Sequence, residues 1–221
     1  MKNKKILAAI FSLACFMFVL TGCGGNEKDS AATSEPATSA STTDAGHDAK
    51  ADKDGQEVSL ADWAGTWNNI GAYLDEAEFA PAFEKLAKEE GKDVDAAKAA
   101  YKEKRKCDFN AMVIDGDKVT FLDGFKDKDG KEVASAEYKF DSTHTTKLGE
   151  HELHWTAFKA TDANAKYPVL LMMPVNTEEP LKHFHLRYGN DVKELLAVEG
   201  WFPAMIAPDA TTEQISGEIA E

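Results

Sequence analysis

The chain has 221 residues, of which 43% are hydrophobic and 29% charged, and its formal net charge is −14. This acidity argues against nucleic acid as a partner and against electrostatic adhesion to anionic lipid. By charge alone, cations are the favoured partners, although acidity also serves the solubility of exported proteins.

The first 22 residues have the pattern of a secretory signal. Three lysines among the first five residues precede an apolar run over 6–20, which is too short for a comfortable membrane span. The run ends in Leu20-Thr21-Gly22-Cys23, which resembles the bacterial lipobox whose cysteine becomes the lipidated N-terminus. We expect 1–22 to be removed and Cys23 to carry a lipid anchor, so that Cys107 is the one cysteine left in the folded part and no internal disulfide forms.

Residues 23–56 are expected to form a disordered tether behind the lipidated cysteine. From residue 24 to residue 56 the sequence has no aromatic residue and no Leu, Ile or Val, so it cannot bury enough surface to offset the entropy of the chain. The segment 57–221 remains as one folded domain with one core.

Helix signals come first in this domain, and strand signals follow. Phe79, Phe83 and Leu86 have helical spacing and predict a helix over 79–90, with a second helix over 93–105. From Cys107 onward the period changes to that of strands, which are predicted at 109–114, 118–121, 133–140, 151–158, 168–173 and 183–188.

Turn and cap residues separate these elements. Asp115-Gly116 is a hairpin signal, and Asp129-Gly130 repeats it with Gly130 expected to supply a positive φ. His144 is placed in a turn. Thr211 and Gln214 have the spacing of a capping box and predict a C-terminal helix. Many short antiparallel strands between helices define the fold class as α+β, mainly β, with the strands forming a barrel.

The clearest candidate for chemistry is the strand around His183 and His185. Strand alternation puts these two histidines and Arg187 on one face, and Phe184, Leu186 and Tyr188 on the other. Two imidazoles at i and i+2 can hold one metal ion. The alternative is a polar strand face exposed to water, since two histidines alone do not complete a tetrahedral site. His154 on a neighbouring strand is a candidate third ligand.

Motifs for other chemistry are weak. The chain has neither a Gly-x-Ser-x-Gly elbow nor a glycine-rich phosphate loop, and Cys107 has no histidine partner in local sequence. Two calcium-like fragments, 52–55 and 127–130, fail because Ala61 or Ala136 stands where the loop requires a bidentate glutamate. We therefore expect the protein not to be an enzyme.

Several blocks in fixed order resemble one family. They are Leu60-Ala61-Asp62-Trp63-Ala64-Gly65-Thr66-Trp67, Ala80-Pro81-Ala82-Phe83, His183-Phe184-His185, Tyr188-Gly189-Asn190-Asp191 and Trp201-Phe202-Pro203. The chain from 59 to 219 resembles the ZinT (YodA) family of exported, lipocalin-like zinc- and cadmium-binding proteins, which also occur fused to solute-binding subunits of zinc importers. The resemblance implies a calycin-like barrel with N-terminal and C-terminal helices, and Gly65-Thr66-Trp67 matches the Gly-x-Trp that opens many lipocalin-type barrels.

The resemblance also implies a metal site built on His183 and His185. The third histidine of the family falls here on Met173, six residues after Tyr167. His154 or a carboxylate such as Glu178 could complete a zinc site. Met173 could instead make a site for a softer metal such as Cu(I), because thioether sulfur is a soft ligand, or the domain could have lost metal binding.

The expected function is that of an extracytoplasmic lipoprotein, anchored to the bacterial cell membrane, that binds zinc, cadmium or copper. It would deliver the metal to the solute-binding subunit of a zinc ABC importer, and its affinity would fall below about pH 6.5, where free imidazole becomes protonated. One alternative is a barrel that binds an organic or apolar ligand among Leu170, Met172, Phe184 and Leu186. Another is a surface module for a protein partner.

Overall fold

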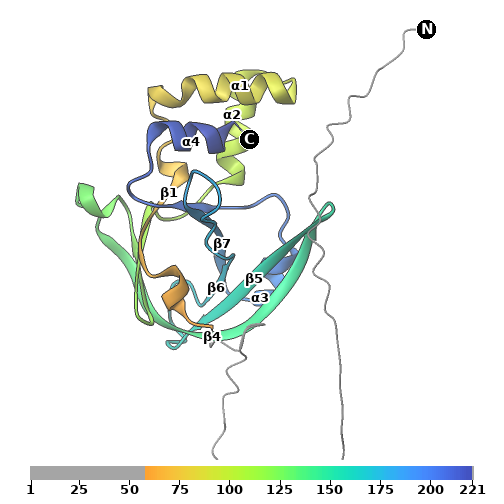
Figure 1. Cartoon of the computed structure of the whole chain (residues 1–221). Helices are drawn as coiled ribbons and strands as arrows, with labels where there is room; N and C mark the ends of the chain where they lie inside the picture. The colour runs from red at the N-terminus through yellow and green to blue at the C-terminus, as the bar shows by residue number, and fades with distance from the viewer. Residues whose placement is uncertain (1–57, 221) are drawn as a thin grey trace, which may run out of the picture. The chain divides into compact units, whose positions relative to one another are not determined.

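Eight antiparallel strands form a closed barrel in the computed structural model, which describes residues 58–220 (Figure 1). The strands are β1 (Gly65–Asn69), β2 (Ala111–Asp115), β3 (Lys118–Leu122), β4 (Glu132–Leu148), β5 (His151–Ala160), β6 (Val169–Met172), β7 (His183–Gly189) and β8 (Ala204–Ile206). Each strand pairs with the next in sequence, and β1 pairs with β8 to close the ring. The predicted barrel is confirmed.

Aromatic and aliphatic side chains fill the barrel. The strands turn alternate residues inward, so Phe184 and Leu186 of β7 join one buried cluster with Leu170 and Met172 of β6. The Trp67 ring meets the Phe184 ring edge to face at 4.9 Å. The four residues expected to line a cavity for an apolar ligand are therefore packed against other core side chains, and all four are at most 1% exposed.

Three helices form a layer over one side of the barrel (Figure 1). They are α1 (Ala80–Glu90), α2 (Val94–Lys104) and α4 (Thr212–Ile219), while the short α3 (Val192–Ala197) lies apart from them. The apolar faces of the layer share a second buried cluster with Ile206 of β8 and Leu181 of the loop before β7. The helical layer therefore covers the outside of the barrel next to β7.

Local sequence explains the ends of these helices. Pro81 lies in the first turn of α1, and Gly91 ends the helix with φ 65°. The Asp93 side chain accepts hydrogen bonds from the first backbone amides of α2. Thr211 and Gln214 form the capping box of α4. All three helices agree with the predicted ones, but β8, which stands between two prolines, and the six-residue α3 are not apparent in the sequence pattern.

Two local predictions are wrong. The positive φ in the second turn belongs to Asp129, at 58°, and not to Gly130. Gly130 is required for a different reason, because a Cβ there would lie 2.2 Å from the carbonyl oxygen of Gly124. His144 lies in β4 rather than in a turn, since β4 continues to Leu148 by pairing with β5.

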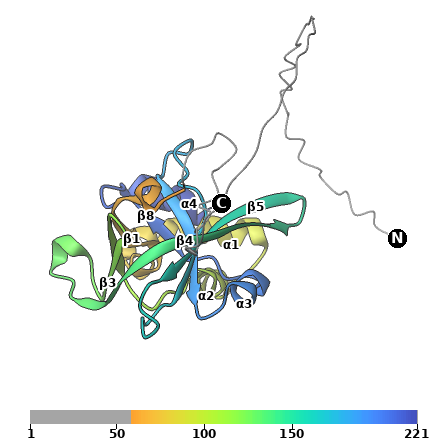
Figure 2. The ribbon, with the colours of Figure 1, turned by 90° about the horizontal axis from the view of Figure 1, so that it is seen from below.

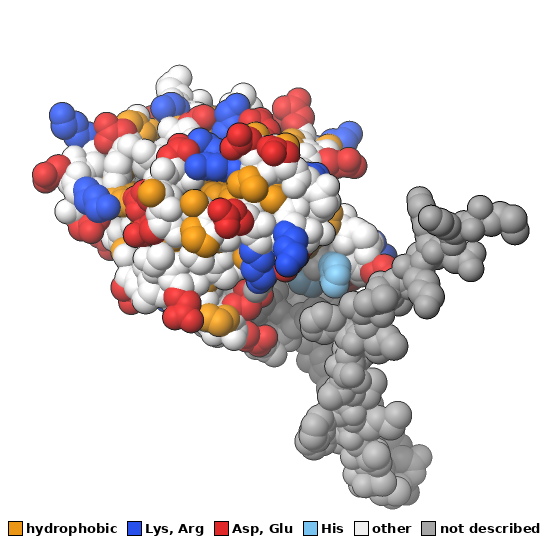
Figure 3. Space-filling view, turned by 90° about the horizontal axis from the view of Figure 1, so that it is seen from above, with side chains coloured by type: hydrophobic (Ala, Val, Ile, Leu, Met, Phe, Trp, Pro, Cys, Tyr) orange, Lys and Arg blue, Asp and Glu red, His pale blue; other side chains and the backbone are white. Residues whose placement is uncertain are grey.

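The long β4–β5 hairpin extends the barrel wall on one side (Figure 2). The face formed by the helical layer carries interspersed acidic and basic side chains with apolar ones between them (Figure 3). Within residues 58–220 no helix combines the length and apolar character needed to cross a membrane.

Candidate metal centre

His183 and His185 lie on the outer face of β7, beneath the helical layer and the loop before β7. Their ring centroids are 5.2 Å apart, and the residues between and after them, Phe184 and Leu186, point into the barrel. The predicted alternation is confirmed. The face is not open to water, however, because His183 is only 5% exposed.

His183 is held in one orientation by the loop that precedes it. Its Nδ1 lies 2.9 Å from the carbonyl oxygen of Leu181. A carbonyl only accepts, so Nδ1 carries the hydrogen and Nε2 keeps its lone pair. One Glu179 carboxylate oxygen lies 3.9 Å from the same nitrogen. The loop therefore fixes the tautomer of His183 and leaves Nε2 available for a metal.

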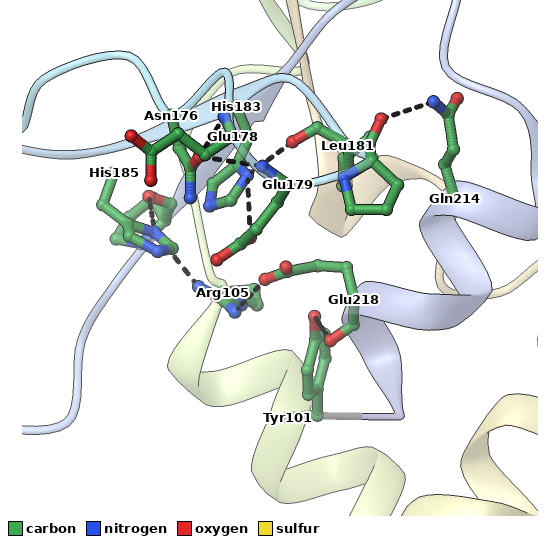
Figure 4. A network of polar contacts seen from close by, with 12 residues as sticks. Tyr101, Arg105, Asn176, Glu178, Glu179, Leu181, His183, His185, Gln214 and Glu218 are labelled. Atoms are coloured by element: carbon green, nitrogen blue, oxygen red, sulfur yellow. Dashed lines mark hydrogen bonds and ion pairs between the residues drawn. The ribbon is translucent and has the colours of Figure 1, made fainter. Parts of the chain in front are cut away.

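Two carboxylates gather around this imidazole (Figure 4). Glu179 comes from the loop before β7, and Glu218 comes from the last turn of α4. One ligand atom from each of Glu179, His183 and Glu218 can be chosen so that all three lie within 4.8 Å of one another. Imidazole nitrogen and carboxylate oxygen are ordinary zinc ligands, so this donor set fits zinc with three protein ligands.

His185 faces a different partner, the guanidinium of Arg105. An Nη1 atom of Arg105 lies 3.1 Å from Nδ1 of His185, and the carbonyl oxygen of Pro203 lies 3.4 Å from the same Nδ1. Burial, with the positive charge of Arg105 as the next cause, lowers the pKa of His185 to about 3. His185 thus stays neutral far below pH 6.5, and the expected loss of affinity near that pH cannot come from this residue.

Arg105 caps the C-terminal end of α2 and links it to α4. Its Nη2 atom lies 2.6 Å from a Glu218 carboxylate oxygen, with both side chains less than 10% exposed. Its Nη1 atom also donates to the carbonyl oxygen of Phe202 at 2.9 Å. The guanidinium lies between His185 and Glu218 in Figure 4, so it contacts both a histidine and a carboxylate of the candidate site.

Two cavities meet at the histidine pair. The first, of about 370 Å³, opens toward α1, α2 and α4, and the second, of about 290 Å³, opens toward the β4–β5 hairpin. Both are lined by Lys104, Arg105, Glu179, His183 and His185. The site is therefore accessible from two sides, with Arg105 lining both.

Met173 lies beside the histidines, as the resemblance implies for the third ligand position. Its amide donates to the carbonyl oxygen of His185 at 2.9 Å, which places the two residues opposite each other just beyond the end of β6. Its side chain lines the second cavity together with His183 and His185. The structure thus brings Met173 to the same hollow as the histidine pair.

The other predicted residues lie elsewhere. His154 is exposed, within 3.3 Å of the Thr145 hydroxyl, and strand alternation turns it to the face of β5 opposite to Leu153, which lines the second cavity. Glu178 is exposed, and it is its neighbour Glu179 that reaches His183. Cys23 is outside the described residues.

Sequence reasoning missed Glu179, Glu218 and Arg105. Glu179 stands four residues before His183, so its proximity to the histidine pair was a usable signal. Glu218 and Arg105 are 33 and more residues from the pair and meet it only because α2 and α4 dock on the outside of the barrel. No spacing rule predicts that docking.

A closed antiparallel barrel with imidazoles and carboxylates collected on its outer face defines a lipocalin-like metal-binding protein rather than a carrier of apolar ligands inside the barrel. Residues 42–221 match the family model described as ZinT (YodA) periplasmic lipocalin-like zinc-recruitment. The chain belongs to this family, and the family assigned from the sequence is confirmed.

Relatives of known name agree with this assignment. The chain is 30% identical over 148 residues to the probable metal-binding protein YrpE of Bacillus subtilis, covering 64% of this chain and 56% of the relative. It is 25% identical over 169 residues to the zinc-binding lipoprotein AdcA of Streptococcus pneumoniae, covering 74% of this chain and 32% of AdcA. The chain therefore spans about half of YrpE and about a third of AdcA.

Solved structures confirm the fold. The Zn(II)-bound ZinT-like domain of Streptococcus pneumoniae AdcA superposes with a TM-score of 0.59 at 22% identity, covering 75% of this chain and 92% of that domain. Zn(II)-bound AdcA of the same organism gives a TM-score of 0.60 at 23% identity, covering 73% of this chain and 35% of AdcA.

The family description names a metal and a compartment in general terms. The family is described by zinc recruitment and by a periplasmic location, in agreement with zinc as the expected metal. The family description is one of metal recruitment. The description does not mention cadmium, copper, a lipid anchor or an importer.

Proposed function

We propose that this chain is an exported lipoprotein that binds zinc on the outer face of its barrel through His183 and His185, with Glu179 and Glu218 as the oxygen ligands. The metal would then pass to the solute-binding subunit of a zinc ABC importer. Binding and release, rather than catalysis, are the activity.

The observation that carries the proposal is the cluster of Glu179, His183 and Glu218. Their ligand atoms converge within 4.8 Å, and His183 already presents the lone pair of Nε2 because its Nδ1 is bonded to Leu181. These residues come from the loop before β7, from β7 itself and from α4, so three elements must fold together to form the site. With His185 as a fourth donor, this set would complete a tetrahedral zinc site.

A softer metal is the second candidate, and Met173 is the reason. Its side chain lines the cavity that His183 and His185 share, so two imidazoles and one thioether lie around one hollow. Thioether sulfur prefers Cu(I) over Zn²⁺. The two candidates use the same histidines but different third ligands, so substitutions separate them.

The experiment is a chelator-competition titration of the purified protein with Zn²⁺ and, under reducing conditions, with Cu(I). The variants are His183→Ala, which removes a ligand common to both candidates, and Met173→Leu, which removes the sulfur and keeps the volume. His154→Ala is the matched control, because it removes an imidazole outside the hollow.

Zinc binding that is lost in His183→Ala and kept in Met173→Leu and His154→Ala supports the zinc site. Tight Cu(I) binding that is lost in Met173→Leu supports the softer metal. Zinc affinity that is unchanged by His183→Ala contradicts the proposal. Binding of neither metal would favour the alternative of a surface module for a protein partner.

The anchor and the delivery step need their own tests. The relatives named zinc-binding lipoproteins favour a lipid on Cys23, and we expect Cys23→Ala to release the protein from the membrane fraction of the producing cells. Retention of this variant in the membrane would contradict the anchor. Delivery predicts that zinc-loaded protein transfers its metal directly to the importer's solute-binding subunit. The transfer should be faster than the release of zinc from the loaded protein to a chelator in solution.

A further inference from the structure

The bond between Arg105 and His185 has a chemical consequence for metal binding. A guanidinium only donates hydrogen bonds, and a neutral imidazole has one nitrogen with a hydrogen and one with a lone pair. Since Arg105 donates to Nδ1 of His185 at 3.1 Å, the lone pair of His185 is at Nδ1 and its hydrogen is at Nε2. In this arrangement neither nitrogen of His185 can bind a metal.

His183 provides the contrast two residues away on the same strand face. Its Nδ1 donates to Leu181, so its lone pair is at Nε2, free of the backbone. The two histidines of one pair therefore hold opposite tautomers. His183 is ready to bind, and His185 is occupied by a side chain of the protein itself.

We propose that Arg105 is a reversible internal block on this site, which holds His185 in the tautomer that cannot bind metal and must withdraw from it before His185 becomes a ligand. The inference rests on the proposed function of the histidine pair. It adds that the metal-free site contains its own competing cation.

The withdrawal has a defined end state. When Arg105 leaves Nδ1, that nitrogen takes up a proton from water and the resulting N–H donates a hydrogen bond to the carbonyl oxygen of Pro203, which already lies 3.4 Å away. Nε2 gives its proton to water. His185 gains one proton and loses one, so the change is a tautomer exchange and not a titration. Nε2 then carries the lone pair, as it does in His183.

The surroundings of Arg105 allow this movement. Its Nε atom is buried and has no hydrogen-bond partner among the described residues, so the guanidinium is incompletely satisfied where it stands. The first cavity, of about 370 Å³, lies beside it. Glu218 can keep its bond to Nη2 through one oxygen and offer the other to the metal, so the bonds that change are those of Nη1, to His185 and to the carbonyl oxygen of Phe202.

The first test reads the tautomers directly by ¹⁵N NMR of the imidazole rings. In the metal-free protein we expect His183 with hydrogen on Nδ1 and His185 with hydrogen on Nε2. Addition of Zn²⁺ should move the hydrogen of His185 to Nδ1. Hydrogen on Nδ1 of His185 before metal is added, or a ring unchanged by bound zinc, would overturn the inference.

The second test measures zinc affinity in Arg105→Met. Removing a charge-assisted hydrogen bond that competes with the metal should tighten zinc binding by roughly 10-fold. Lys104→Met is the matched control, because it removes one positive charge from the lining of the same cavities without touching His185. Its exposed charge is screened, so we expect a change of about twofold.

The outcomes separate the two proposals. Equal gains in the two variants would reduce Arg105 to a simple charge effect and overturn the block, as would weaker binding in Arg105→Met. If Arg105→Met fails to fold, the ¹⁵N spectra of the unaltered protein still decide. Zinc affinity that does not depend on His183 would reject the proposed function, while the tautomers of the metal-free protein would remain as measured.

Discussion

Two buried arginines, Arg187 of β7 and Arg105 at the end of α2, lie along the outer face of β7 and differ in how well their hydrogen bonds are satisfied. At one end, Arg187 is 3% exposed, lies 4.7 Å from the rings of both Trp155 and Phe202, and donates to the carbonyl oxygens of Leu195 and Trp201. At the other end, Arg105 donates to a neutral histidine and leaves Nε without a described partner.

The contrast indicates that the Arg187 end stabilises the fold, whereas the Arg105 end has the chemical groups of a binding site. At the Arg187 end the partners of the guanidinium are backbone carbonyls and two aromatic rings. These groups do not form a zinc site, so no metal ion would replace the guanidinium there. The end at Arg105 contains imidazoles and carboxylates. Groups of these two types can accept hydrogen bonds from a guanidinium and can also bind a metal ion. One strand thus fixes the barrel at one end and presents a site at the other.

The largest effect is expected from Arg187→Met. Three carbonyl groups, those of Leu195, Leu196 and Trp201, would lose a donor, and two rings would lose the side chain between them. The free energy of unfolding should therefore fall by about 3 kcal/mol. Zinc affinity of the folded protein should stay within about twofold of the original. Denaturant unfolding and a zinc titration of the same sample measure both quantities. A large loss of zinc affinity without a loss of stability would contradict the structural role assigned to Arg187.

At the histidine end, the free energy of unfolding should depend on pH. The pKa of His185 is about 3 in the folded protein and about 6.5 in the unfolded chain. Below pH 6.5 the unfolded chain therefore binds a proton that the folded protein does not. The stabilisation is complete above pH 6.5 and is lost as the pH falls toward 3, by up to about 1.4 kcal/mol per pH unit.

Unfolding of the metal-free protein between pH 6.5 and pH 5.5 measures this slope, because carboxylates contribute little in that range. His185→Gln should flatten it. If the free energy of unfolding depends on pH equally in the variant and in the unaltered protein, His185 is hydrated and titrates normally. The distinction between the two ends would then not hold.

Much of this molecule could be predicted from its sequence because the barrel repeats a simple pattern. Alternation along β7 correctly assigned His183 and His185 to one face and Phe184 to the other. The capping box at Thr211 correctly predicted α4. These features depend on neighbours in sequence, which a local pattern contains.

The remainder of the site depends on how distant elements dock. Glu218 and Arg105 reach the histidine pair only after α4 and α2 pack over β8, and neither residue has a local signal of this role. The length of β4 was underestimated for a similar reason. His144 has polar neighbours, and its place in a strand comes from pairing with Trp155 on β5.

A smaller effect should distinguish two adjacent glutamates in the loop before β7. Glu179 reaches His183 and belongs to the candidate ligand cluster, whereas exposed Glu178 does not belong to it. Glu179→Gln removes one charged ligand and should weaken zinc binding by about 10-fold, equivalent to about 1.4 kcal/mol. Glu178→Gln changes the net charge equally and should have less than a twofold effect. Equal effects would mean that charge alone attracts the metal to this end.

The smallest effect concerns α4, which carries Glu218 to the site. Thr211→Ala removes the hydroxyl of the capping box and should cost about 1 kcal/mol, so that the amides of α4 exchange their hydrogens about fivefold faster. Zinc should slow this exchange, because a metal bound to Glu218 ties α4 to β7. The amides of α3, which lie at the Arg187 end, provide an internal reference that zinc should leave unchanged. An equal response of α3 and α4 to zinc would show that the two ends are coupled and that the division between them does not hold.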